Sequence, residues 1–246
     1  PNPWANNVAT VTRSAASGPL SPTVTSYAYE ANFNKPARIT DALGRVTLVE
    51  YDSWTSNPLA VTADAGAAPH FNVRTAATYN EIGLVASTTD PLGVVTRHSY
   101  DGFGNRVSTV ADAGTGRLNL TTTFTYDARG DPLSVTDPRG NTVTSSYDAA
   151  RRLVTTTTPA TPSAPGGVRT TNTYDADNRP IQVQQSANGS VLRTVSTTYT
   201  LSGRQATTTD ANGNVTRFAY DPLDRLASVT DAAGRVTTYA YDAVSR

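Results

Sequence analysis

A tyrosine recurs along almost the whole chain at a nearly fixed interval, and this repeat restricts the possible fold more than any other feature. The series consists of Tyr29, Tyr51, Tyr79, Tyr100, Tyr126, Tyr147, Tyr174, Tyr199, Tyr220 and Tyr241. The shortest and commonest spacing is 21 residues. A fixed period of this kind indicates a repeat architecture, in which one small unit stacks on its neighbours.

Each repeat contains two turn signals. Seven of the ten tyrosines are followed directly by aspartate, and a residue that tolerates positive φ stands four positions after the tyrosine in Gly83, Gly104, Gly130, Asn178, Gly203 and Asp224. Aspartate and glycine recur together 11 to 13 residues after the tyrosine. The complete Asp-x-x-Gly pairs are Asp41, Gly44, Asp90, Gly93, Asp137, Gly140, Asp210, Gly213, Asp231 and Gly234. Both patterns are typical of tight turns, because the aspartate caps backbone N–H groups and glycine accepts left-handed backbone.

The segments between the turns predict strands. Residues 106–110, 141–146 and 226–230 are rich in valine and threonine and partly alternate in polarity. Two strands of about six residues and two turns account for a 21-residue unit. We therefore predict an all-β fold of some twenty short antiparallel strands, with about half of the chain in strands and almost no helix.

The connections differ in length, which indicates where loops are enlarged. Long and short returns alternate through the first six units, and we expect exposed loops at 65–78, 112–125 and 158–173. The expected organisation is an N-terminal partial repeat or flanking strand at 1–26, followed by about ten repeats at 27–246 that form one continuous strip.

Composition excludes several classes of protein. Twenty Lys and Arg balance twenty Asp and Glu, which argues against a basic nucleic-acid binder. No cysteine is present, so disulfides, thiolate metal sites and cysteine nucleophiles are absent. No membrane-spanning apolar run or signal peptide is apparent. Methionine is missing even at position 1, so we expect a piece of a longer protein with any export signal outside it.

No group of residues predicts catalysis, a metal site or a cofactor. Every aspartate falls on a repeat turn, whereas a glycosidase needs two carboxylates held close together. His98 stands where other units carry an aromatic residue, and His70 lies in a long loop, so we interpret the first as a packing residue and the second as solvated. The turns at 175–178 and 210–214 lack the remaining ligands of a calcium loop.

The tyrosines allow two interpretations. They could stack bases or sugars, but one tyrosine per unit at a fixed place favours a structural ladder packed on neighbouring strands, with each hydroxyl at the rim of the sheet. We also expect arginines after the turn glycine, as at Arg204 and Arg235, to pair with nearby turn aspartates.

The pattern Tyr-Asp-x-x-Gly, a Val/Thr strand and Asp-x-x-Gly resembles the YD repeats of RHS-repeat proteins. The runs 126–140 and 220–234 match closely, and the resemblance covers residues 27–246. This family includes bacterial polymorphic toxins, components of insecticidal toxin complexes and teneurins. The resemblance implies a β-strip that coils into a solenoid or hollow shell, which in the bacterial toxins encloses a C-terminal toxic domain. The run 90–95 departs from the family's self-cleaving core motif, so no such site is carried over.

The resulting hypothesis is a non-enzymatic structural module of a bacterial, secreted or cell-surface protein. It would form part of a shell around a covalently linked C-terminal toxin or other cargo. Its partners would be flanking repeats and that cargo, with no nucleic acid and no membrane insertion by this segment. The alternative is an extracellular adhesion module whose long loops bind glycan or protein.

Overall fold

The computed structural model describes residues 8–13, 23–66 and 69–242, and it divides into two compact units, 1–122 and 123–246. Every regular element in these ranges is a β-strand, and about half of the chain is in strands. The predicted all-β class with some twenty strands is therefore confirmed. Of the expected N-terminal segment 1–26, residues 1–7 and 14–22 lie outside the described residues.

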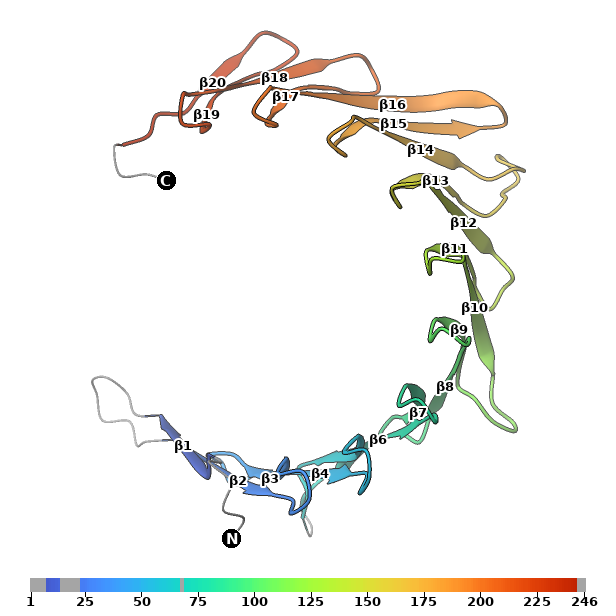
Figure 1. The fold of residues 1–246 in the computed structure, drawn as a ribbon, viewed down its shortest axis with the longest axis vertical. Coiled ribbons are helices and arrows are strands. Elements are labelled where there is room, and N and C mark those ends of the chain that lie inside the picture. Colours follow the sequence, from blue (N-terminus) through green and yellow to red (C-terminus); the bar gives the residue numbers. More distant parts are fainter. Residues whose placement is uncertain (1–7, 14–22, 67–68, 243–246) are drawn as a thin grey trace. The chain divides into compact units, whose positions relative to one another are not determined.

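The first unit contains nine strands, drawn in blue to green in Figure 1. They are β1 (Thr10–Arg13), β2 (Thr23–Tyr29), β3 (Pro36–Thr40), β4 (Val46–Tyr51), β5 (Pro58–Ala63), β6 (Val73–Tyr79), β7 (Val85–Thr89), β8 (Val95–Tyr100) and β9 (Arg106–Ala111).

The second unit contains the remaining strands, with β10 starting just before its first residue. They are β10 (Leu120–Tyr126), β11 (Pro132–Thr136), β12 (Thr142–Tyr147), β13 (Leu153–Thr157), β14 (Arg169–Tyr174), β15 (Pro180–Ala187), β16 (Ser190–Tyr199), β17 (Gln205–Thr209), β18 (Val215–Tyr220), β19 (Leu226–Thr230) and β20 (Val236–Thr238).

Within each unit every strand pairs antiparallel with the strand that follows it in sequence (Figure 1). Successive connections therefore alternate between the two edges of the sheet. The turns after the repeat tyrosines all lie at one edge, which we call the tyrosine edge. The Asp-x-x-Gly turns and the long loops lie at the opposite edge, which we call the loop edge.

Most of the short turns at both edges share one geometry, which Asp137 illustrates, while the turns that begin at Glu30 and Asp52 are one residue longer. Its N–H donates to the Asn141 carbonyl at 2.9 Å, and the Gly140 N–H donates to the Asp137 carbonyl at 3.0 Å. Its Oδ1 accepts the N–H groups of Arg139 and Asn141, both at 2.8 Å. This is a three-residue hairpin loop that ends in a left-handed residue.

Positive φ occurs at all six positions that the sequence predicts for the turns at the tyrosine edge. The angles are 80° at Gly83, 85° at Gly104, 84° at Gly130, 65° at Asn178, 84° at Gly203 and 61° at Asp224. Arg151 takes the same place with φ of 64°, although its side chain gives no such signal in the sequence.

The connection between β15 and β16 differs from the other turns. Ala187 pairs with Ser190, and the two residues between them, Asn188 and Gly189, have φ of 52° and 77°. Two consecutive positive values define a type I′ turn, for which Asn-Gly is the preferred sequence. This hairpin has longer strands and a tighter turn than its neighbours.

Each unit is a single layer of sheet with almost no core. Among the described residues, the buried apolar ones are Val46, Ala60, Ala65, Ala113 and Ala164. The accessible surface is 16,548 Å², whereas a compact protein of 25.9 kDa exposes about 10,500 Å². Burial of apolar side chains therefore stabilises this fold less than usual, and hydrogen bonds of turns and neighbouring strands matter more.

The turn geometry yields a matched test with two glycines. Gly140 has φ of 84° and Gly102 is outside the positive region, yet a Cβ would meet nothing within 4 Å at either residue. We expect Gly140→Ala to lower the free energy of unfolding by about 1 kcal/mol, because an L-residue is strained there. Gly102→Ala should change it by less than about 0.5 kcal/mol. Urea unfolding measures both, and equal effects would contradict the assigned turn.

Candidate functional site

The repeat tyrosines connect consecutive turns at the tyrosine edge. The hydroxyl of Tyr199, at the end of β16, donates to the carbonyl of Pro180, the first residue of β15, at 2.8 Å. Seven other repeat tyrosines do the same to the residue at or near the start of the preceding strand, at 2.8 to 3.0 Å. They are Tyr29, Tyr51, Tyr79, Tyr100, Tyr174, Tyr220 and Tyr241.

A bulge accompanies every described tyrosine hairpin. The register shifts between each repeat tyrosine and the residue before it, so that one extra residue stands in the following strand. In the hairpin of β10 and β11 this residue is Leu133, between Pro132 and Ser134. Bulges re-aim side chains at the end of a ladder, and here they occur where the tyrosine reaches back to the preceding strand.

In several repeats a cation fills the space between one turn and the next repeat tyrosine, a space that we call the inter-turn slot. Arg152 Nε donates to Asp148 Oδ2 at 2.7 Å, and its guanidinium lies 4.8 Å from the centre of the Tyr174 ring. The same arrangement joins Arg179 to Asp175 and Tyr199, and Arg225 to Asp221 and Tyr241. The cation–π contact and the ion pair together hold consecutive repeats in register.

Asp131 and Arg151 form an ion pair that the sequence did not predict. Asp131 is 8% exposed, and Arg151 Nη2 lies 2.6 Å from its Oδ1. Arg151 Nε also contacts both oxygens of this carboxylate, at 3.1 and 3.0 Å. These residues belong to consecutive turns and are 20 positions apart, so only the alignment of one repeat on the next brings them together.

The arginines that follow a turn glycine pair with turn aspartates, as the sequence predicted. Arg235 Nε lies 2.6 Å from Asp231 Oδ2, within its own turn. Arg204 Nε lies 3.7 Å from Asp224 Oδ2, which belongs to the next turn at the tyrosine edge. Both arginines are largely exposed, so each pair adds little stability by itself.

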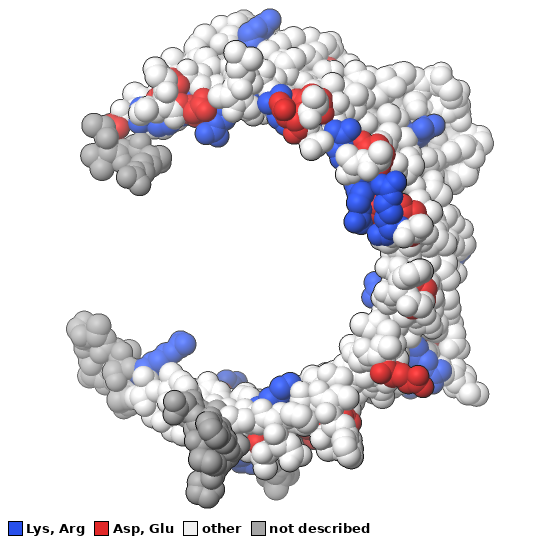
Figure 2. All heavy atoms as spheres, viewed as in Figure 1, with Lys and Arg blue, Asp and Glu red and all other residues white. Residues whose placement is uncertain are grey.

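Figure 2 shows the charged side chains as small groups of mixed sign rather than as a field of one sign. The ion pairs of the turns account for this pattern. Such a surface is poorly suited to attracting a polyanion through net charge.

The two long loops at the loop edge of the first unit have the same internal framework. In both, the last residue, an asparagine, donates its backbone N–H to the carbonyl of the first aspartate, at 3.1 and 3.0 Å. Its side chain also exchanges hydrogen bonds with the backbone of a glycine. The residues are Asp64, Gly66 and Asn72 in the first loop, and Asp112, Gly114 and Asn119 in the second. Phe71 and Leu118 project from equivalent positions and are 85% and 74% exposed.

The histidines lie apart and have separate partners. His70 Nδ1 lies 2.7 Å from Asp64 Oδ1 in the loop, so this ring is paired rather than simply solvated. His98 is partly buried on β8, where Nδ1 lies 3.1 Å from Thr109 Oγ1, and burial lowers its pKa. Neither forms a relay with a serine and a carboxylate.

No cluster of three or more metal-ligating side chains occurs among residues 8–13, 23–66 and 69–242. The carboxylates of the two acidic turns considered for calcium are engaged elsewhere: Asp175 contacts Arg179, and Asp210 accepts from Asn212 and Asn214. No helix in the part of the chain that the structure describes could cross a membrane.

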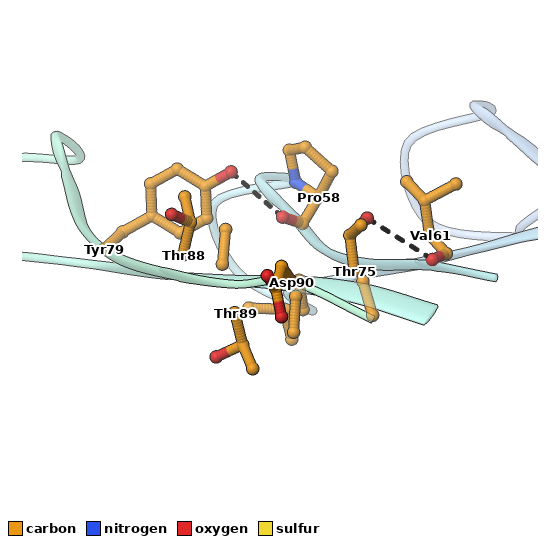
Figure 3. A pocket seen from close by; sticks show the side chains of 11 residues that line it. Pro58, Val61, Thr75, Tyr79, Thr88, Thr89 and Asp90 are labelled. Carbon is orange, nitrogen blue, oxygen red and sulfur yellow. Dashed lines mark hydrogen bonds between the residues drawn. The ribbon is translucent and has the colours of Figure 1, made fainter. Parts of the chain in front are cut away.

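A hollow of about 380 Å³ opens on one face of β5, β6 and β7 (Figure 3). It forms beside Ala77, at the place two residues before the repeat tyrosine where other units carry Tyr27, Phe124, Phe218 or Tyr239. Tyr79 bounds it, with its hydroxyl on the Pro58 carbonyl at 2.9 Å. Asp90 and Tyr79 are the ionisable residues of its lining.

Comparison with known proteins places the chain in a family. The RHS repeat model matches residues 79–117, 110–142, 126–162, 199–234 and 220–246, which is more than half of the chain. The protein is thus a member of the RHS repeat family, as its YD pattern predicted. No curated protein matches its sequence.

Solved structures with the same fold belong to toxin complexes. The crystal structure of TcdB2-TccC3 has a TM-score of 0.71 and 16% identity, covering 93% of this chain. The Tc holotoxin pore of Photorhabdus luminescens has a TM-score of 0.53 and 17% identity, covering 94%. The present chain spans 14% of the length of either matched chain. At this identity the likeness concerns the fold alone.

The turn carboxylates predict acid sensitivity. The pKa of Asp137 lies below its usual range because the Asn141 side chain and then its backbone N–H donate to the carboxylate. Arg45 lowers the pKa of Asp41 in the same way. A lowered carboxylate pKa adds stability that is complete above the ordinary value of about 3.9 and is lost as pH falls through the folded-state value.

We therefore expect the melting temperature to be level near neutral pH and to fall below about pH 4. Asp137→Asn keeps an oxygen for the turn N–H groups but has no charge to lose. Its melting temperature should be lower at pH 7 and should fall less steeply in acid. Thermal unfolding followed by circular dichroism measures both curves, and parallel curves would contradict a role for this carboxylate.

Proposed function

We propose that this chain is a structural, non-enzymatic segment of a larger secreted or cell-surface protein of bacteria. It would form part of the wall of a hollow shell around a covalently linked C-terminal toxin or other cargo. The observation that carries the proposal is the hydroxyl ladder of eight repeat tyrosines, each of which bonds to the start of the preceding strand.

Three further features support a wall. The units are single layers of sheet, so a wall built from such layers needs few residues. Charged side chains form ion pairs within the turns rather than a catalytic group. The matched toxin-complex chains are several times longer than this segment, which leaves room there for additional repeats and other domains.

The repeat tyrosines and the Asp-x-x-Gly residues are, in this proposal, the structural residues of the wall. The partners would be flanking repeats and cargo of the same polypeptide. The proposal includes no cofactor, because the turns and the tyrosine ladder hold the repeats of the wall together.

Adhesion through the loop edge is a second candidate. Phe71 and Leu118 are exposed at equivalent positions of two similarly built loops, where each could contact an apolar part of a ligand. A glycan array and a surface-protein pull-down with the 246-residue chain would test it. Loss of a captured ligand in the double variant Phe71→Ser and Leu118→Ser, with unchanged melting temperature, would favour adhesion over enclosure.

The shell proposal predicts protection of cargo. The native polypeptide that contains this segment, purified from its source, should survive limited proteolysis with a C-terminal segment beyond Arg246 intact. After denaturation the same protease should degrade that segment, because the wall no longer excludes the protease. Intact mass before and after denaturation measures the difference.

A C-terminal segment cleaved equally fast in both states would contradict enclosure. So would a native polypeptide with nothing beyond this repeat region.

A further inference from the structure

Three turns at the tyrosine edge of the first unit end in a residue other than a cation, at Asn57, Leu84 and Asn105, and a hollow lies beside the first of them. Asn57 stands at the end of the turn between β4 and β5, the place that Arg152, Arg179 and Arg225 take in the second unit and Lys35 takes in the preceding turn. The Asn57 side chain is too short to cover the next repeat tyrosine, Tyr79. A hollow of about 330 Å³ remains there.

The hollow keeps the groups that bind arginine in the filled slots. Its lining includes Asp52 and Tyr79, the counterparts of Asp148 and Tyr174 around Arg152. Asn80 and Gly83 of the next turn also line it. In the filled slot the equivalent turn supplies the Asp175 carbonyl at 3.2 Å and Asn178 Oδ1 at 2.8 Å to Arg152 Nη1.

The acceptors in this hollow are available. Asp52 Oδ1 receives the N–H groups of Trp54 and Thr55 and the Thr55 hydroxyl, but no described residue donates to Oδ2. Glu81 adds a second carboxylate to the lining, and no Lys or Arg lies among the lining residues. No cation of the described residues lies over the Tyr79 ring, whose hydroxyl donates to the Pro58 carbonyl at 2.9 Å.

We propose that this slot, formed by Asp52, Asn57, Tyr79, Asn80 and Glu81, binds the guanidinium of an arginine side chain from another polypeptide segment. The incoming plane would stack on the Tyr79 ring while its N–H groups donate to Asp52 Oδ2 and the carboxylate of Glu81. Arginine fits better than lysine, because a planar fork can stack and donate in two directions at once. The independent support is that three equivalent slots of this chain hold an arginine in that position.

The test uses the 246-residue chain labelled with ¹⁵N and titrated with N-acetyl-arginine methylamide. Saturable shifts are expected at the amides of Thr55, Asn80 and Gly83. The citrulline analogue, which has the same shape but no charge, should bind at least about fivefold more weakly. Equal responses to both compounds, or no saturable response to arginine, would overturn the proposal.

Asn57→Arg provides the decisive variant, because it should place a guanidinium in the slot from within. We expect it to raise the melting temperature and to abolish the response to the arginine compound. An undiminished response in a folded Asn57→Arg protein would place the binding elsewhere and overturn the proposal.

Asp52→Asn removes the charge and keeps the turn, because Asn80 already caps the next turn with its Oδ1, which accepts from Ile82 and Leu84 at 3.2 and 2.9 Å. This variant should weaken arginine binding several-fold. The matched control is Asp210→Asn, the same substitution in a turn at the loop edge of the second unit, which should leave binding unchanged.

The arginine could come from a separate chain or from another stretch of the same polypeptide. The longer native polypeptide, titrated in the same way, tells these apart. A response there indicates a separate chain, whereas its loss, with the response retained by the 246-residue chain, indicates an internal arginine.

Discussion

The hydrogen bond from a repeat tyrosine to the start of the preceding strand, made by eight of the ten, is the interaction on which the rest of the structure depends. A hairpin of two short strands is marginally stable in water, and a single layer buries little apolar surface to compensate. The tyrosine adds a contact between consecutive turns that strand pairing alone does not supply. For Tyr199 this contact is a 2.8 Å bond to the Pro180 carbonyl.

The turns explain how so many polar residues coexist with a thin sheet. In most of the short turns one aspartate caps two backbone N–H groups, as Asp137 does, so turn backbone is satisfied without a covering layer. A cation at the end of the turn then contacts the ring of the next unit, as Arg179 contacts Tyr199 at 4.7 Å. The side chains that cap the turns thus also take part in the contacts between consecutive repeats.

Much of this was predictable from the sequence because the determinants are local. The positions of the strands, the Asp-x-x-Gly turns and the left-handed backbone at Gly130 and Asn178 all follow from residue types a few positions apart. The repeat also allowed the family to be identified from its YD pattern.

The remaining features depend on how one repeat aligns on the next. The acceptor of the Tyr199 hydroxyl lies on the preceding strand, and the pair of Asp131 and Arg151 joins residues of consecutive turns. The empty slot at Asn57 becomes visible only when all the turns are compared in space. An alignment of the repeats by turn position shows that Asn57, Leu84 and Asn105 stand in place of the cation, but it does not show the hollow beside Asn57.

Tyr199→Phe, compared with Tyr239→Phe, tests the role of the ladder most directly. Tyr239 is 45% exposed and its hydroxyl bonds to no described residue, so it controls for loss of a hydroxyl alone. Urea unfolding and amide hydrogen exchange should show Tyr199→Phe less stable by about 1 kcal/mol, with faster exchange in the turns at both 175–179 and 200–204. Equal stability of the two variants, or a change confined to the turn after Tyr199, would contradict the claim that tyrosines hold consecutive units together.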